Sequence, residues 1–537
     1  MSTDHEKEPL VSKSAEGMLK LTEAGREAID TWVTDIDSNV YAFTPEADGL
    51  MVAGTFARLS RNSNGVKEIL INEFFDKENK DSELLHRVVT EFGDDSVMQL
   101  YMMQLVFEGP SNLAIKLAIE NGRLAGYLEQ SSRYLRFDKK NEEGRYAYYT
   151  PEEFDPETAV EYEEAMDGIF DIYSDLYQKM YAFIEAKSDE PQETRNFAWR
   201  NAVHAQACDT VRALLPAATK ATVGVVGSAQ AINNMILSME GHGLPEVNKL
   251  GRQALAAARG VAPVFFERTD MPDRGGLISA QKSNSRINSR ALANEFMPDT
   301  DAEAKTGPRV EVVSVNGTED ELVAKILVDS SDKSYEYVRA VVETLTDEQK
   351  QQVIETYVDE RYNRRVKPGR AFEIIDYVIE GQTDFGAFRD IQRTRLVDAF
   401  KWQSLQNKLG HVRPAAIDEA GLTEEYEKAF AISAKAYKML AERGYNEQAQ
   451  YATLFGHVMR FSMKVNARSL LHTTELRTTP QGHPSYRKFY QDLHEQIAAI
   501  HPNVAKAMKF VGKGEDEALA RLGAERHFEA KQLAAEQ

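Results

Sequence analysis

The chain has 537 residues, 42% of them hydrophobic, which is enough for roughly two to four domains with sizeable cores. Its net charge of −21 excludes a protein that depends on nucleic acid or anionic membrane, because both require a basic surface. The single cysteine, Cys208, excludes a disulfide framework and a cysteine-based zinc cluster. The charged start MSTDHEKEPLVSKS lacks the apolar core of a signal peptide, and no apolar run suggests a membrane span, so we expect a cytoplasmic protein.

The first half of the chain is predicted to be mainly helical. Residues 1–45 are a polar, acidic lead-in with one short amphipathic helix. Residues 82–107 indicate a helix, a Gly-Asp break and an apolar strand. Apolar residues spaced three and four apart favour helices over most of residues 112–258. Residues 268–308 are rich in Gly, Pro, Ser, Asn and charge, and predict a linker or long surface loop.

A second set of elements begins at residue 309. "RVEVVSVNG" predicts a β-branched strand ending in an Asn-Gly turn, and helices follow to about residue 362. "KPGRAFEIIDYVIEGQ" predicts a loop and an apolar strand, followed by a helix that contains "RDIQRTRLVDAFKWQ". Helices are then expected at 422–443 and 445–474, with a charged helix in the tail.

The two halves share one order of elements: a strand, a helix with an arginine motif, a long acidic helical hairpin, and a helix with an Asn- or Gln-containing motif. Their direct identity is low, so an internal duplication is inferred from order and spacing. We expect an α+β fold with two tandem domains, each a mixed sheet with long helices. The predicted boundaries are 1–45 for the lead-in, 46–267, 268–308 for the linker, 309–512, and 513–537 for the C-terminal helix.

Three pairs of segments occupy matching places in the two halves. They are "NGRLAGYLEQSSRY" (121–134) with "RTRLVDAFKWQSLQ" (393–406), "VRALLP" with "AQYATLF", and "GSAQAINNMILSM" with "VNARSLLHTTELR". Taken singly, each is typical of an ordinary helix or a solvated charged face. Arginine also presents a rigid fork of donors that grips phosphate oxygens, so the arginines are candidates for an anion site.

In their order and spacing, these segments resemble the flavin-dependent thymidylate synthases, whose signature has the form R-H-R-x-x-S-x-N-E-x-S-x-R-Y. The first half matches the signature at Arg123, Glu129, Ser131, Arg133 and Tyr134, and departs from it at Asn121, Gly122, Gly126 and Leu128. The second half matches only its start and differs later, at Arg393 and Arg395 with Thr394 for the histidine, then Asp398, Phe400, Lys401, Gln403 and Leu405.

The other two pairs carry the resemblance further. The second half keeps the family's Asn-Ala-Arg helix and its distal arginine, at Asn466, Ala467, Arg468 and Arg477. The first half has other residues there, namely Ser228, Gln230, Asn234 and Met239. It keeps Arg212 in "VRALLP", where the second half has Gln450.

The resemblance implies reductive methylation of dUMP to dTMP, with 5,10-methylenetetrahydrofolate as carbon donor and NADPH as reductant acting through FAD. For dUMP it implies Glu129, Gln130, Ser131, Ser132, Arg133, Arg212, Arg393 and Arg477. For FAD it implies Arg393, Thr394, Arg395, Asn466, Ala467, Arg468, His472, Glu129, Arg123 and Asn234. Arg477 resembles the arginine on the uracil ring, where a cation stabilises the charge that forms as N3 loses its proton, and is the catalytic candidate. No metal is expected.

Some readings stay open. His472 is also compatible with a structural histidine, and His483 resembles a histidine of some members without an assigned role. Arg393 and Arg395 are two residues apart and would converge better from a loop just before the helix than on it.

The losses in the two halves are complementary, since each keeps the segments that the other lacks. Active sites in the resembling family lie between subunits, so a fused chain would act as a pseudo-dimer with one composite site. Two chains would then form a homodimer equivalent to a tetramer. The missing motif histidine leaves two alternatives. One is a degenerate relative that binds flavin or nucleotide as a regulatory or structural protein, and the other is a flavin enzyme acting on another uracil nucleotide.

Overall fold

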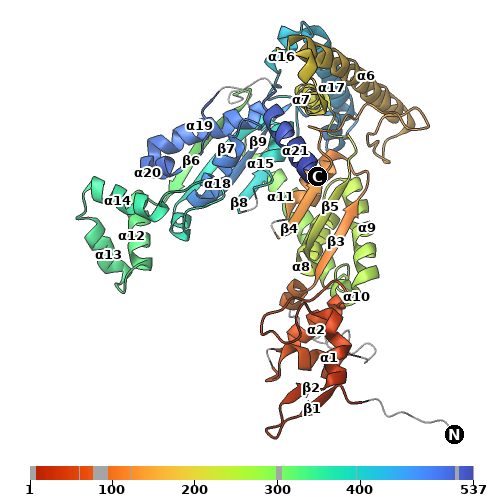
Figure 1. The fold of residues 1–537 in the computed structure, drawn as a ribbon. Helices are drawn as coiled ribbons and strands as arrows, with labels where there is room; N and C mark the ends of the chain where they lie inside the picture. The colour runs from red at the N-terminus through yellow and green to blue at the C-terminus, as the bar shows by residue number, and fades with distance from the viewer. Residues whose placement is uncertain are drawn as a thin grey trace, which may run out of the picture. The chain divides into compact units, whose positions relative to one another are not determined.

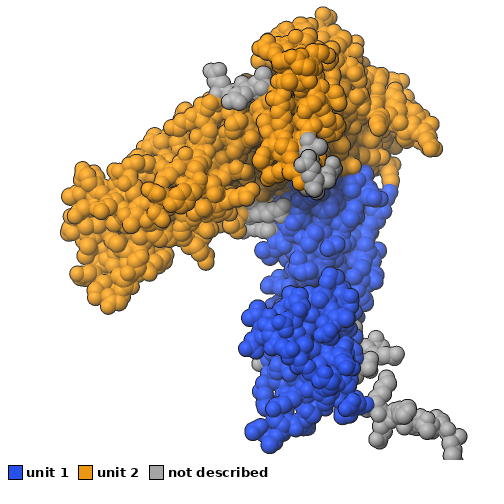
Figure 2. Space-filling model, in the orientation of Figure 1, with its two compact units in different colours: residues 1–110, 114–129, 221–298 blue, residues 111–113, 130–220, 299–537 orange. Residues whose placement is uncertain are grey.

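A computed structural model describes the chain in seven ranges: 8–59, 61–75, 95–122, 124–297, 305–394, 396–514 and 519–535. The chain divides into two compact units (Figure 2). Unit 1 comprises residues 1–110, 114–129 and 221–298. Unit 2 comprises residues 111–113, 130–220 and 299–537. These units do not follow the two sequence halves, because unit 2 contains the helical hairpin of the first half. The domain boundaries given above therefore stay a prediction.

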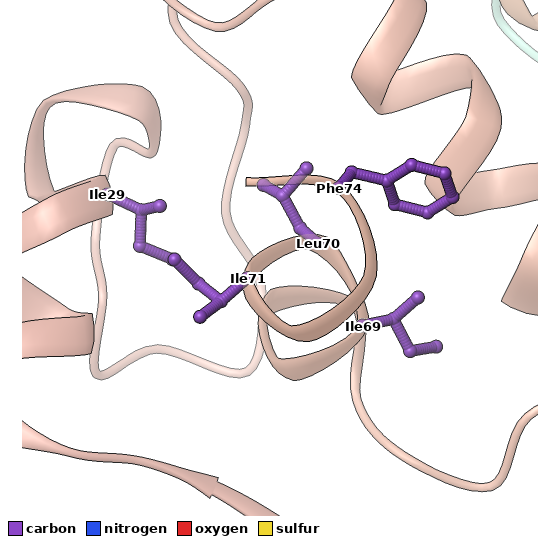
Figure 3. Close-up of a cluster of buried hydrophobic side chains, with 5 residues drawn as sticks. All are labelled: Ile29, Ile69, Leu70, Ile71 and Phe74. Carbon is purple, nitrogen blue, oxygen red and sulfur yellow. The ribbon is translucent and has the colours of Figure 1, made fainter. Parts of the chain in front are cut away.

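Unit 1 begins with a small module that has its own core. Its elements are β1 (Val11–Lys13), β2 (Leu19–Leu21), α1 (Glu23–Ile29), α2 (Gly49–Leu59) and α3 (Val66–Ile69). Thr22 caps α1 by accepting a hydrogen bond from the backbone N–H of Gly25, which satisfies an otherwise unpaired donor. The core consists of Ile29, Ile69, Leu70, Ile71 and Phe74 (Figure 3). The short helix predicted for the lead-in is α1, whereas the β1–β2 hairpin was not predicted.

The rest of unit 1 is built on a three-stranded antiparallel sheet in the order β3-β5-β4 (Figure 1). Its elements are β3 (Met102–Phe107), α5 (Asn112–Leu117, whose first two residues belong to unit 2), β4 (Ala125–Glu129), β5 (Val223–Ser228), α8 (Ala229–Glu240), α9 (Pro245–Val261), α10 (Pro263–Phe266) and α11 (Gly275–Phe296). Alternate residues of β3 are buried, as expected for a strand with one face on a core. Helices α8 and α9 pack on this sheet.

Unit 2 contains a four-stranded antiparallel sheet in the order β6-β7-β9-β8. Its strands are β6 (Arg309–Asn316), β7 (Asp376–Asp384), β8 (Asp398–Trp402) and β9 (Val458–Asn466). The two central strands pair over their full length, with Gly381 opposite Phe461. A Cβ atom on Gly381 would lie 2.3 Å from the ring of Phe461, so glycine is required there.

The long helices of the two halves pack together within unit 2. Helix α6 (Pro156–Lys187) lies against α7 (Phe197–Val211) and against α17 (Thr423–Glu442). Asp155 caps α6 and Pro156 occupies its first turn, which explains where this helix begins. The other helices of unit 2 are α12 (Glu319–Asp329), α13 (Tyr335–Val342), α14 (Asp347–Val358), α15 (Phe385–Ile391), α16 (Ala415–Glu419), α18 (Ala467–Arg477), α19 (Pro484–Ile500), α20 (Pro502–Ala507) and α21 (Leu522–Ala535).

The predicted duplication is visible in the topology. The first half runs β3-α5-β4-α6-α7-β5-α8, and the second runs β7-α15-β8-α16-α17-β9-α18. The corresponding strands also have the same order in their sheets, β3-β5-β4 and β7-β9-β8. Within unit 2 the segments after α7 and before β9 pair with each other, with Pro216 opposite Leu454. The α+β fold with two tandem copies is therefore confirmed.

Four local predictions were wrong. The arginine motif of the first half, expected on a helix, contains the strand β4. Residues 275–296, expected to be a linker or surface loop, form α11. The helix expected over "RDIQRTRLVDAFKWQ" ends at Ile391, and β8 follows, since Phe400 and Trp402 pack against Phe388. The segment expected as a helix over 445–474 contains β9, whose alternating buried residues from Met459 onward show the period of a strand.

Other predictions hold. The strands at 102–107 and 309–316, the helices before residue 362, α17 and the C-terminal helix are present. The helix expected at the start of 82–107 lies outside the described residues. In the described ranges, no helix combines the length and apolar character needed to cross a membrane.

Candidate active site

Arg133 and Asp209, whose side chains are 13% and 15% exposed, form a bidentate ion pair in unit 2. Nε and Nη2 of Arg133 donate to the two carboxylate oxygens of Asp209, on α7, at 2.8 and 2.7 Å. Nη1 of Arg133 donates to the hydroxyl of Tyr486 at 3.0 Å. Burial alone would raise the pKa of Asp209, but the hydrogen bonds and charge of Arg133 lower that pKa to about 2. Burial likewise opposes the charge on Arg133, yet Asp209 raises its pKa overall. Both groups are therefore ionised at neutral pH.

Arg212 follows directly after α7 and is 3% exposed. Its Nη1 lies 3.8 Å from a carboxylate oxygen of Asp390, on α15. Its Nη2 is buried and makes no hydrogen bond within the described part of the chain. Burial lowers the pKa of Arg212, and the charge of Asp209 opposes this effect. A buried donor without a partner costs free energy, which an anionic ligand could recover.

Arg477, the last residue of α18, meets the same Asp390 from the second half. Its Nη2 donates to the backbone carbonyl of Asp390 at 2.5 Å, and its Nη1 lies 3.6 Å from the carboxylate. Its Nε is buried and has no hydrogen-bond partner among the described residues. Burial would raise the pKa of Asp390, but Arg212, Arg477 and neighbouring arginines lower it. Asp390 thus joins an arginine of each half.

Helix α19 supplies a tyrosine and a histidine to this cluster. The Tyr486 ring lies 5.8 Å from the guanidinium of Arg133 and 5.4 Å from that of Arg477, within the range of cation–π attraction. His483 caps α19, where its Nδ1 accepts a hydrogen bond from the N–H of Ser485 at 3.3 Å. Burial, followed by the charge of Arg212, lowers the pKa of His483 to about 3, so the imidazole is neutral.

A cavity of about 990 Å³ opens within unit 2. Its lining includes Arg133, Asp209, Arg212, His483, Arg487 and Arg521. Nucleotide-sized ligands occupy cavities of this order. The whole lining carries seven lysines and arginines and five aspartates and glutamates, so its basic side chains are in slight excess although the whole chain is acidic.

The structure brings together four of the predicted site residues in unit 2. Ser132, Arg133 and Arg212 come from the first half and Arg477 from the second. Ser132 is buried, and its Oγ accepts a hydrogen bond from Arg389, on α15, at 3.1 Å. Ser131 is half-buried and Gln130 is exposed. Arg393 is exposed, and lies in a loop as expected, but after α15 rather than before it.

Glu129 belongs to the other unit. It ends β4 in unit 1, is 6% exposed, and its carboxylate lies 2.6 Å from Nζ of Lys116. Lys116 also pairs with Glu120 at 2.5 Å. Asn234 is exposed on α8, also in unit 1. Arg123 and Arg395 lie outside the described residues.

The remaining predicted flavin residues lie on α18 or beside α15. Asn466 caps α18 by accepting from the N–H of Ser469 at 2.8 Å, and Ala467 is buried. Nε of Arg468 donates to the carbonyl of Pro368 at 2.8 Å. Thr394 is half-buried.

Buried atoms without partners test whether α18 fits a flavin. Two buried atoms on α18, Nδ1 of His472 and Nε of Arg477, form no hydrogen bond with any described residue. Burial, more than the nearby Lys367, lowers the pKa of His472, which leaves a neutral ring. A polar heterocycle such as flavin could pair with the Nδ1 atom of His472, so this residue fits the cofactor, while the Nε atom of Arg477 is left for the substrate.

Sequence reasoning missed Asp209, Asp390, Tyr486 and Arg521. Asp209 lies three residues before Arg212 and Asp390 three before Arg393, which could have drawn attention to both aspartates. Both arginines lie beyond the ends of the helices, however, and the aspartates pair with other arginines. Tyr486 and Arg521 lie far along the chain from the motifs and had no such signal.

The sequence and structure were compared with known proteins. The family model described as "Thymidylate synthase complementing protein" matches residues 39–264 and 311–503. Relatives named UPF0159 protein are 28% identical, one from Chlamydia muridarum over 522 residues, covering 93% of this chain and 96% of the relative, and one from Thermoplasma acidophilum over 496 residues, covering 87% and 96%.

A solved structure was also matched. It is the UMP/dUMP methylase PolB from Streptomyces cacaoi bound with 5-Br dUMP, with 16% identity and a TM-score of 0.33, covering 39% of this chain and 97% of that one. A score this low carries no argument. Since the two segments that match the family model span most of the sequence, this chain belongs to the thymidylate synthase complementing protein family, as a tandem duplication.

Proposed function

We propose that this chain is a flavin-dependent thymidylate synthase that converts dUMP to dTMP at one composite site in unit 2. The observation that carries the proposal is the meeting of Arg133 and Arg212, from the first half, with Arg477, from the second. Two aspartates and the ring of Tyr486 connect these three arginines. These three arginines, which the two halves retain separately, thus lie in one compact unit.

Arg133 and Arg212 would bind the 5′-phosphate of the nucleotide. Both line the cavity; Arg133 is partly buried and Arg212 is buried, and Arg212 keeps an unpaired donor among the described residues. Asp209 already binds Arg133 through two hydrogen bonds, as a ligand phosphate would. The phosphate would therefore compete with this carboxylate, and its higher charge favours the exchange.

Arg477 would stabilise the uracil ring. Its contacts with Asp390 fix the guanidinium in position before substrate binds, and its buried Nε remains available as a donor. A preorganised cation stabilises the negative charge that develops on the ring when N3 loses its proton. Arg477 would therefore act in the reaction as well as in binding.

FAD, when bound, supplies the transfer of the one-carbon unit and of hydride, with NADPH as reductant and 5,10-methylenetetrahydrofolate as carbon donor. Arg393, Asn466, Arg468 and His472 are the residues that we propose hold it. We further propose a cytoplasmic protein that forms a homodimer of tandem chains.

A product assay tests the proposal. The purified chain would receive FAD, NADPH, 5,10-methylenetetrahydrofolate and dUMP, and the products would be separated by chromatography. We expect dTMP. Its absence, while a flavin-dependent synthase of known activity works in parallel, would overturn the synthase assignment. A parallel reaction with UMP would show whether another uracil nucleotide is the substrate.

A second candidate function is binding of nucleotide or flavin without dTMP formation, as a regulatory or structural protein. The observation that favours it is that several key side chains are already engaged. Arg133 is bound at both carboxylate oxygens of Asp209, Asn466 caps a helix, and Arg468 holds the loop at Pro368. Calorimetric binding of dUMP by a protein that makes no dTMP would establish this function instead.

A further inference from the structure

A C-terminal segment outside the matched family regions reaches the anion-binding cavity. The second matched region ends at residue 503, whereas Arg521 lies just before α21, in unit 2. Helix α21 packs against α7, and the N–H of Leu519 donates to the side chain of Gln206 on α7 at 2.9 Å. Residues 519–522 line the cavity. The tail is therefore part of the site wall.

Arg521 shares a carboxylate with the proposed phosphate-binding residue Arg133. Its Nη2 donates to Oδ2 of Asp209 at 2.7 Å, the same oxygen that Nη2 of Arg133 contacts at 2.7 Å. The guanidinium of Arg521 also lies 4.8 Å from the ring centroid of Tyr134. The arginine is thus fixed on one side by an ion pair and on the other by an aromatic face.

The geometry leaves Arg521 with an unused donor. The residue is 8% exposed, and its Nη1 is buried and hydrogen-bonds to none of the described residues. Arg212 lines the same cavity, and its Nη2 is likewise buried and without a hydrogen-bond partner among the described residues. Two buried, charged donors without partners beside one cavity are costly unless a ligand with several acceptor oxygens satisfies them.

The charge balance points to the same kind of ligand. The guanidinium groups of Arg133 and Arg521 share one carboxylate, that of Asp209. The guanidinium of Arg212 lies 3.8 Å from the carboxylate of Asp390, which Arg477 also approaches. In these contacts four guanidinium groups meet two carboxylates, and a phosphate group, with up to two negative charges and three terminal oxygens, can balance the excess.

We propose that Arg521 is a third phosphate-binding arginine of this site, which the tail adds to Arg133 and Arg212. The identity of the ligand as dUMP rests on the proposed function. In the ligand-free protein Asp209 serves as the internal counter-ion of Arg133 and Arg521. When nucleotide binds, its phosphate takes over part of that role, and the tail contributes directly to affinity for the phosphorylated substrate.

The test compares two variants of the full-length protein. Arg521→Ala removes the proposed contact. Lys531→Ala is the control, because Lys531 lies exposed on the same helix α21 and is not among the residues that line the cavity. Binding of dUMP, inorganic phosphate and deoxyuridine would be measured by calorimetry, directly or by competition. We expect Arg521→Ala to weaken dUMP and phosphate binding by on the order of 10- to 100-fold, leaving deoxyuridine binding unchanged. Arg521→Lys should restore part of the loss.

The outcomes separate this inference from the proposed function. If wild type binds dUMP and Arg521→Ala binds it equally well, the inference is overturned and the proposed function stands. If Arg521→Ala weakens dUMP and deoxyuridine equally, the arginine is structural and the inference also fails. If wild type binds phosphate but no uracil nucleotide, and Arg521→Ala loses phosphate, the inference holds and the proposed function falls. Failure of wild type to bind phosphate or dUMP would overturn the inference.

Discussion

Helix α8 of unit 1 and helix α18 of unit 2 show what the duplication has kept and what it has lost. Each follows the central strand of its sheet and begins with the same device, since Ser228 accepts a hydrogen bond from the N–H of Ala231 and Asn466 accepts one from the N–H of Ser469. Eleven residues after each cap the helices differ. The second half has Arg477 there, held by Asp390, and the first half has Met239.

Met239 has become part of a core. It is fully buried, and a Cβ atom on Gly251 of α9 would lie 3.0 Å from the Cβ of Met239. The neighbouring helix α9 therefore packs directly against Met239. The two halves have kept the same helix cap and strand order but not the same site residues. Caps and strand order depend on backbone geometry, whereas a site depends on individual side chains.

The two units also differ in what their buried ion pairs do to the motif residues. In unit 1, Lys116 pairs with Glu129 of the signature segment and so engages that residue inside the fold. In unit 2, Arg361 pairs with Glu475, two residues before Arg477, with both side chains fully buried. The pair in unit 2 supports α18 next to the proposed catalytic arginine.

The largest effect is expected from removing Arg477. Arg477→Ala should reduce dTMP formation by roughly 100-fold or more, because a preorganised cation at the uracil ring is lost. Flavin content, followed by visible absorbance, should stay at the wild-type level, since the substitution spares the other α18 residues. Turnover close to wild type in this variant would refute the role of Arg477.

Breaking the buried pair in unit 2 should have the largest effect on stability. Glu475→Ala leaves Arg361 buried without its carboxylate partner and should lower the free energy of unfolding by about 3 to 5 kcal/mol. Chemical denaturation would measure it. The double variant Arg361→Met with Glu475→Leu is the control and should recover most of the loss. If Glu475→Ala were as stable as wild type, the Arg361–Glu475 pair would not stabilise the fold.

Restoring the arginine in the first half should not restore a site. Met239→Arg places a charge in a packed core and should cost about 3 kcal/mol. The residues that would have to support it are absent, since Asn121 and Ser228 stand where the second half has Arg393 and Asn466. Titration with dUMP should give an unchanged stoichiometry. A second dUMP-binding site in this variant would show that the first half lacks only this arginine, and would contradict the loss of several site residues.

The smallest effect concerns the neutral histidine of unit 2. Unfolded His483 takes up a proton near pH 6.5, whereas the folded residue does so only near pH 3, so stability is lost as pH falls from 6.5 towards 3. His483→Asn keeps a capping side chain and should remove about 1 kcal/mol of this loss at about pH 5.5. Thermal midpoints at about pH 7.5 and 5.5 would show it. An unchanged pH dependence would mean that His483 titrates normally.

Periodicity and motif order predicted much of this molecule. The strands at 102–107 and 309–316 and the helix at 423–442 have clear patterns in their sequences. The helix at 275–296 was missed because its Ser and Asn content is typical of loops, and because only Gly275 and Ser279 of it are buried, so that no buried apolar stripe marks it.

The site was predictable to the extent that its residues lie in motifs. Arg133, Arg212 and Arg477 were expected to meet, and they occur in one unit. The burial of Glu129 against Lys116 could not be foreseen, since it depends on how β4 packs on its own sheet. The approach of Arg521 depends on the docking of α21 on α7, which no local pattern encodes.

The most direct test of the central claim asks whether one chain contains a whole site. Arg133→Ala and Arg477→Ala chains, carrying different tags, would be produced together, and the mixed oligomer would be purified through both tags and assayed for dTMP formation and dUMP binding. Because both arginines must belong to the same chain, the account predicts that the mixture is as inactive as either variant alone. Restored turnover or binding in the mixture would show that the halves of different chains build the site, and would contradict the account.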